Sequence, residues 1–128
     1  MKFFRTTRRR FVVSFFFFLF LFILAQRPPA NAASFAISSA ADAADVNPGD
    51  GVCITSGGAC TLRAALQEAN ATAGSDTIQL GAGVYTMTIP PGSGDDILSG
   101  DLDITAPLTI IGAGPGSTIL DATALDRA

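Results

Sequence analysis

CITSGGACTLRAALQEAN, residues 53–70, holds both cysteines of the chain and its clearest helical pattern. Its apolar side chains recur at the spacing that places them on one face of an α-helix: Leu62, Ala65, Leu66 and Ala69. The opposite face carries Arg63, Gln67 and Asn70. Thr61 precedes the pattern as a favoured N-cap residue, and Gly74 follows it as a terminating glycine. The stretch predicts a helix over about residues 61–71, and a helix this short needs an apolar surface to dock on.

Cys53 and Cys60 flank a turn that contains Gly57 and Gly58, so the segment between them can fold back on itself. In an exported protein this pair predicts a disulfide, with free thiols as the alternative. Such a bridge would fix the approach to the helix. The chain has no histidine and no other cysteine, so its composition argues against a zinc site.

The rest of the chain after residue 33 consists of short runs rich in Ile, Val, Leu and Thr, separated by Gly, Pro and Asp. Each run has the length of a strand: SFAISS (34–39), DTIQL (76–80), GVYTMTI (83–89), DLDI (101–104), PLTII (107–111) and STILD (117–121). An antiparallel β-sandwich is one arrangement of such strands, and a β-solenoid is the other.

A comparison of the chain with itself favours the solenoid. A shift of 24 residues places Ile78 on Leu102 and Val84 on Leu108, so that two copies of strand, short turn and strand coincide. Few large aromatic side chains remain to fill a globular core, because residues 33–128 contain only Phe35 and Tyr85.

The first 32 residues predict a signal peptide. A basic segment with five Lys or Arg residues precedes the run 11–25, which is apolar except for Ser14, and Ala30-Asn31-Ala32 supplies small residues for cleavage near Ala32–Ala33. The apolar run is shorter than the 18 or so residues of a membrane anchor, the alternative. Arg8, Arg9 and Arg10 also leave twin-arginine export open beside the general secretory route.

Residues 33–128 are strongly acidic. They carry all eleven carboxylates of the chain and only Arg63 and Arg127 as bases, a formal charge of −9 (−11 + 2). This balance argues against nucleic acid as a partner and suits a secreted or cell-surface protein. We divide the chain into the signal peptide (1–32), a cap region (33–76) and a β region (77–128) that we expect to be truncated.

Two sets of acidic residues are candidate cation sites. The first set consists of oxygen-bearing side chains in one predicted loop: Asp42, Asp45, Asn47 and Asp50. These side chains could bind Ca²⁺, or they could form local hydrogen bonds with the backbone of a turn. Asp101 and Asp103 would share a face of a strand, either solvated or on a cation. Arg63 and Glu68 are interpreted as a structural ion pair or hydrogen-bonding residues rather than a catalytic pair.

The order of these motifs, NPGDGVC, GGACTLRAALQEAN, DTIQLGAGVYTMT, GDLDI, PLTIIGAGPGSTILD and LDR, resembles the CSLREA-type domain over about residues 35–127. That domain opens bacterial right-handed parallel β-helix proteins of the secreted or surface type. The family heptad corresponds to residues 60–66, and Ala64 stands where the family usually has Glu. Glu68 and Asn70 match the family's following EAN.

The resemblance implies a mainly β fold of the pectin-lyase-like kind: an N-terminal cap helix plus the first coils of a right-handed parallel β-helix, which we expect to be incomplete. The helix would cover the otherwise unpaired end of the first coil. The residues expected to build this cap are Thr61, Leu62, Arg63, Leu66, Glu68 and Asn70.

We therefore expect a non-catalytic, structural or adhesive module without a cofactor, whose partners are downstream coils and surface glycans or components of host or neighbouring cells. A fragment of a polysaccharide lyase and a Ca²⁺-stabilised extracellular module are the alternatives. A lyase needs carboxylates for Ca²⁺ and a basic proton acceptor, and residues 33–128 offer only two bases.

Overall fold

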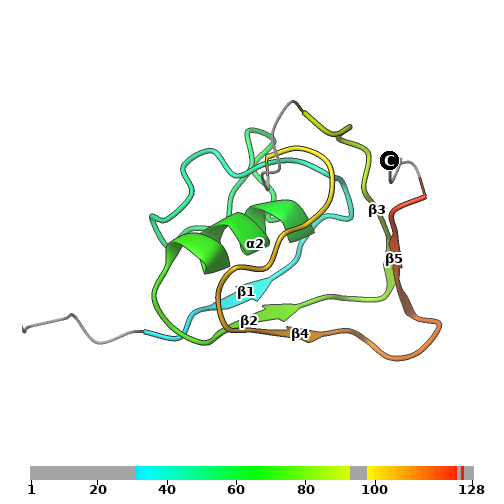
Figure 1. Cartoon of the computed structure of the whole chain (residues 1–128). Helices are drawn as coiled ribbons and strands as arrows, with labels where there is room; N and C mark the ends of the chain where they lie inside the picture. Colours follow the sequence, from blue (N-terminus) through cyan, green and yellow to red (C-terminus); the bar gives the residue numbers. More distant parts are fainter. Residues whose placement is uncertain (1–30, 93–97, 124, 126–128) are drawn as a thin grey trace, which may run out of the picture.

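A computed structural model describes residues 31–92, 98–123 and 125 of the chain (Figure 1). The predicted signal peptide lies outside these residues except for Asn31 and Ala32. In the part that is described, no helix is both long and apolar enough to span a bilayer.

The described chain is mainly β, with one short helix. Its elements in order are β1 (Ser34–Ala36), α2 (Leu62–Ala71), β2 (Asp76–Gln79), β3 (Gly83–Thr86), β4 (Leu108–Ile111) and β5 (Thr118–Asp121). The strands form one sheet of order β1-β2-β4 and a second of order β3-β5, and all neighbours are parallel. Figure 1 shows α2 over one side of the first sheet, with the β3–β5 pair turned away at one end.

The strand register corrects the 24-residue repeat. Ile78 pairs with Ile110, an offset of 32 residues, and Val84 pairs with Ile119, an offset of 35. The offsets are longer because the chain between β3 and β4 includes a segment, residues 98–105, that returns to the helix before β4 begins. The parallel pairing also excludes the antiparallel sandwich for these strands.

Residues 101–104, DLDI, do not form the predicted strand. Their backbone is drawn into hydrogen bonds with the helix instead: the Asn70 amide donates to the Asp103 carbonyl (2.8 Å), and the Arg63 guanidinium donates to the Asp101 carbonyl (3.4 Å). Asp101 and Asp103 therefore lie on a loop and do not share a strand face.

The core lies between α2 and the strands. It gathers the apolar face of the helix, one residue from each of β1, β2 and β3, and two residues that follow strands: Phe35, Leu62, Ala65, Leu66, Ala69, Ile78, Leu80, Tyr85 and Met87. The helix thus docks on an apolar surface as predicted. Thr61 caps its start, since its hydroxyl accepts the Ala64 N–H (3.2 Å).

The polar face of the helix is buried as well as the apolar one. Every residue of α2 from Leu62 to Ala69 is buried, including Arg63, Gln67 and Glu68. Loops on both sides cover the polar face, which sequence periodicity cannot reveal because it detects only where apolar residues recur. The last turn closes through the Thr72 N–H, which donates to the Glu68 carbonyl (3.0 Å).

Candidate functional site

The polar face of α2 is formed by Arg63, Gln67, Glu68 and Asn70, of which the first three are buried. Its centre is an ion pair between Arg63 and Asp42. Arg63 Nε lies 2.6 Å from Asp42 Oδ1 and Nη2 lies 3.1 Å from Oδ2, with both side chains fully buried. This two-point contact is the geometry that a guanidinium and a carboxylate favour.

The pair joins segments far apart in sequence. Asp42 Oδ2 also accepts the N–H groups of Thr88 (2.7 Å) and Ile89 (2.9 Å), just after β3. Arg63 Nη2 donates to the Gly100 carbonyl (2.8 Å). One ion pair therefore ties the helix to three loops.

The same contacts set the pKa of Asp42. Burial acts to raise the pKa of this carboxyl, but the hydrogen bonds from Arg63, Ile89 and Thr88 outweigh it, and the charge of Arg63 adds to them. The pKa of Asp42 therefore lies below its usual value, and the group is an anion near neutral pH.

Glu68 and Gln67 hold the loop that precedes the helix. The two carboxylate oxygens of Glu68 accept the N–H groups of Gly49 and Gly51, each at 2.8 Å. Gln67 Oε1 accepts the Asp45 N–H (2.7 Å). These side chains accept from backbone donors along the loop over residues 45–51 and so fix its path next to the helix.

Asn70 holds the loop on the other side. Its amide donates to the Asp103 carbonyl (2.8 Å), and its Oδ1 accepts the Thr105 N–H (2.9 Å). In the described chain, every buried side-chain N or O atom has a hydrogen-bond partner. The polar helix face is thus a scaffold for loop backbones, in which Arg63 pairs with Asp42 and Glu68 binds N–H groups.

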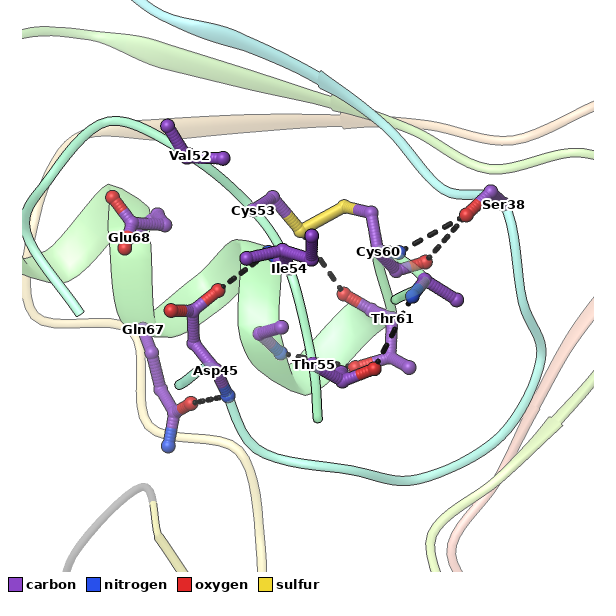
Figure 2. Close-up of a disulfide and its surroundings, with 12 residues drawn as sticks. Ser38, Asp45, Val52, Cys53, Ile54, Thr55, Cys60, Thr61, Gln67 and Glu68 are labelled. Carbon is purple, nitrogen blue, oxygen red and sulfur yellow. Dashed lines mark hydrogen bonds between the residues drawn. A yellow bond between two sulfur atoms is a disulfide. The ribbon is translucent and has the colours of Figure 1, made fainter. Parts of the chain in front are cut away.

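The predicted disulfide between Cys53 and Cys60 is present (Figure 2). It closes the loop directly before the N-cap residue Thr61, with the two Cα atoms 5.1 Å apart. Cys60 is also pinned to the chain after β1, since its N–H donates to Ser38 Oγ and its carbonyl accepts the Ser38 N–H, each at 3.0 Å. The bridge fixes where the helix starts.

Of the predicted calcium ligands, Asn47 hydrogen-bonds to both Asp45 and Asp50, whereas Asp42 is paired with Arg63. Asp42 faces Arg63, Asp45 accepts the N–H groups of Asn47 and Ile54 (2.8 Å each), and Asp50 accepts the Val52 N–H (2.8 Å) and the Asn47 amide (3.0 Å). Over residues 31–92, 98–123 and 125, no three acidic, His or Cys side chains group as a metal site. Calcium binding stays an untested prediction.

The sequence did not indicate the partners of the polar helix face. The sequence feature that could have indicated these partners is the presence of four hydrogen-bonding residues on one short helix between loops rich in Gly and Asp. No family model matches the chain, and neither a curated protein nor a solved structure was found to be similar to it.

Proposed function

We propose that this chain is the non-catalytic N-terminal capping module of a secreted or cell-surface β-helix protein with a structural or adhesive role. The apolar face of α2 covers the first strands, since it packs with Phe35 of β1, Ile78 of β2 and Tyr85 of β3. In the described part of the chain, β4 and β5 at the other, open end have no such cover. This asymmetry is what a cap requires, because a cap must end the stack on one side and continue it on the other.

The observation that carries the proposal is the exposure of residues stacked in register. Phe35, Ile78 and Ile110 are successive partners across β1, β2 and β4, and their exposed fractions are 6%, 0% and 39%. Tyr85 and Leu120 are partners across β3 and β5, with 5% and 53% exposed. Each row of side chains is buried at the closed end and bare at the open end.

The open end also has unused backbone and a hollow. β4 and β5 are each the last strand in the order of their sheet among the described residues. Next to them lies a hollow of about 370 Å³ lined by Leu80, Ile110, Gly112, Gly114, Pro115, Thr118 and Leu120. A further parallel coil would pair with these edges and cover the apolar side chains.

The buried polar residues support a structural role over catalysis. Arg63 is the only basic residue in the described part of the chain, and it is held in the ion pair with Asp42. A lyase needs a basic group that reaches its substrate. We therefore assign binding of glycans or cell components to coils that follow the cap.

The gene beyond codon 128 tests this proposal. We expect it to continue in frame with further short β runs, and the longer protein to be a stable, β-rich monomer. A stop codon directly after Ala128, together with a stable monomeric product, would contradict the capping role. Release of unsaturated uronates from polygalacturonate by the isolated chain would contradict its non-catalytic nature.

The open end can be tested in the chain itself. Binding of a hydrophobic dye should fall in the double variant Ile110→Ser/Leu120→Ser. Ile104→Ser is the matched control, because Ile104 is 55% exposed but belongs to a loop rather than to a stacked row. Equal dye binding by all three proteins would count against an apolar docking end.

A further inference from the structure

Asp76, the first residue of β2, is a buried carboxylate with neutral partners. It is 1% exposed. Its Oδ1 accepts the backbone N–H of Ala33 (2.7 Å), and its Oδ2 accepts the Thr72 hydroxyl (2.9 Å). Arg63, the only basic side chain in the described residues, is occupied with Asp42. A buried carboxylate without a cation is costly, so Asp76 is a site that favours a positive charge.

Ala33 is the residue that predicted signal-peptide cleavage would make the first of the chain. Its carbonyl accepts the Thr77 N–H (2.9 Å), and β1 begins at the next residue, Ser34. Ala33 also packs against the core, whereas Asn31 and Ala32 before it are exposed. The cleavage position therefore coincides with the point where the chain enters the fold.

Gly74 provides the space for this segment. A Cβ at position 74 would lie 2.6 Å from the Asn31 carbonyl oxygen and 3.2 Å from the Ala32 nitrogen. Real Cβ atoms do not approach backbone that closely, so glycine is needed where Asn31 and Ala32, the two residues before the Ala32–Ala33 bond, pass the turn after α2. The uncut chain already places the Ala33 nitrogen on Asp76.

We propose that Asp76 is the receptor for the α-ammonium group created at Ala33 when the signal peptide is removed. This inference rests on the export part of the proposed function. A signal peptidase adds one water across the Ala32–Ala33 peptide bond, which leaves a carboxylate on Ala32 and an amine on Ala33 that takes up a proton near neutral pH. The N–H donor at Asp76 Oδ1 then becomes a cation, and a neutral hydrogen bond becomes an ion pair.

The consequence is that export processing completes the fold. Charge-assisted hydrogen bonds are stronger than neutral ones, and the new ammonium gives Asp76 the counterion that no side chain supplies. The paired terminus would hold β1 on β2 and so anchor the edge of the three-stranded sheet next to α2.

The first test is the position of the mature terminus. The full chain is expressed in an exporting bacterial host, and the mass of the exported product is measured. We expect the mass of residues 33–128. Cleavage at another bond would overturn the Asp76 inference and leave export standing, whereas a chain that is neither exported nor cleaved would overturn both.

The second test measures the reactivity of the new α-amino group. Residues 33–128 contain no lysine, so this group is the only primary amine of the processed protein. The native protein is acetylated with an amine-reactive ester, and the rate is measured by mass spectrometry. This rate should be about tenfold to a hundredfold slower than the rate in urea, because that ratio corresponds to the strength of a hydrogen bond to a charged group. Equal rates in the native and unfolded protein would overturn the inference.

Variants assign the protection to Asp76. Asp76→Asn should raise the native labelling rate toward that in urea, whereas Asp121→Asn, which changes a half-buried carboxylate of β5 that accepts from Thr123 rather than from Ala33, should leave it unchanged. Circular dichroism checks that Asp76→Asn is folded. Thr72→Val is the second variant, because it removes the hydroxyl next to Oδ2 (and its contact with the Glu68 carbonyl) but keeps the carboxylate, and it should give an intermediate rate. Native labelling rates that are the same in wild type, Thr72→Val and folded Asp76→Asn would refute the assignment.

Discussion

The guanidinium of Arg63 and the carboxylate of Asp42 lie 2.6 Å apart with both side chains fully buried. The pair links the N-terminal turn of α2 to the loop after β1 and, through Asp42, to the chain after β3. Because the two charges compensate each other, loss of either partner leaves the other buried and unpaired.

Replacement of Arg63 should be strongly destabilising. We expect Arg63→Met to lower the free energy of unfolding by about 3–5 kcal/mol, the range for breaking a buried pair from one side. Arg63→Lys keeps the charge but loses the two-point contact, so its loss should be smaller. Urea denaturation followed by circular dichroism measures both. A loss below about 1 kcal/mol for Arg63→Met would show that the pair is not central to the fold.

The lowered pKa of Asp42 predicts a stability loss in acid. A carboxyl whose folded pKa lies below its unfolded value stabilises the fold above the unfolded pKa, near 3.9 for Asp, and loses this contribution as pH falls through the folded pKa. Thermal midpoints should therefore fall below about pH 4. Asp42→Asn should be less stable than wild type at pH 7 and show a shallower decline in acid. If the thermal midpoints of wild type and Asp42→Asn fell in parallel as the pH is lowered, the result would rule out this role.

Glu68 should control the loop that contains Gly49 and Gly51. Glu68→Ala removes the acceptor of both N–H groups, and a hydrogen bond to a charged group contributes about 1.5–3 kcal/mol. We expect faster amide exchange at Gly49 and Gly51 and lower stability. Asp50→Asn is the control, because the Asp50 side chain lies on the exposed part of the same loop. Unchanged exchange at both glycines in Glu68→Ala would contradict the scaffold role.

The sequence was sufficient for the local elements. Thr61 as N-cap, the apolar spacing from Leu62 to Ala69 and the Cys53–Cys60 disulfide all have local causes, and the structure contains each. Five of the six apolar runs became strands, because Ile-, Val- and Thr-rich segments between Gly and Pro favour extended backbone.

Long-range partners could not be predicted in this way. Periodicity gave no sign that Arg63 would meet Asp42 or that Asn70 would hold the backbone at Asp103 and Thr105, since these contacts join side chains to irregular loops. The loop of residues 98–105 is also the reason why the predicted 24-residue repeat differs from the observed strand offsets, because its residues lengthen the chain between β2 and β4. The hydrogen bond from the Ala33 N–H to Asp76 could not be predicted either, because it also joins a side chain to the backbone of a distant segment.

The disulfide should make a modest contribution. Its half-cystines lie 7 positions apart in the sequence, so the chain-entropy model gives a stabilisation below the value for a 15-residue loop, about 3 kcal/mol. We expect Cys53→Ser/Cys60→Ser, or reduction of the wild type, to lower the thermal midpoint without unfolding the protein at 25 °C. Complete unfolding on reduction would mean that the bridge, rather than the polar helix face, holds the cap together.

Ile78 and Ile110 give the most direct test of the capping role, because they are the same residue type at partnered positions of β2 and β4. In residues 1–128, Ile78→Ala should cost about 2–5 kcal/mol and Ile110→Ala clearly less, since Ile110 is partly exposed. The decisive measurement is the cost of Ile110→Ala in the protein extended by the residues that its gene encodes after Ala128. The capping role predicts that this cost rises to that of Ile78→Ala, and a cost unchanged by the extension would contradict it.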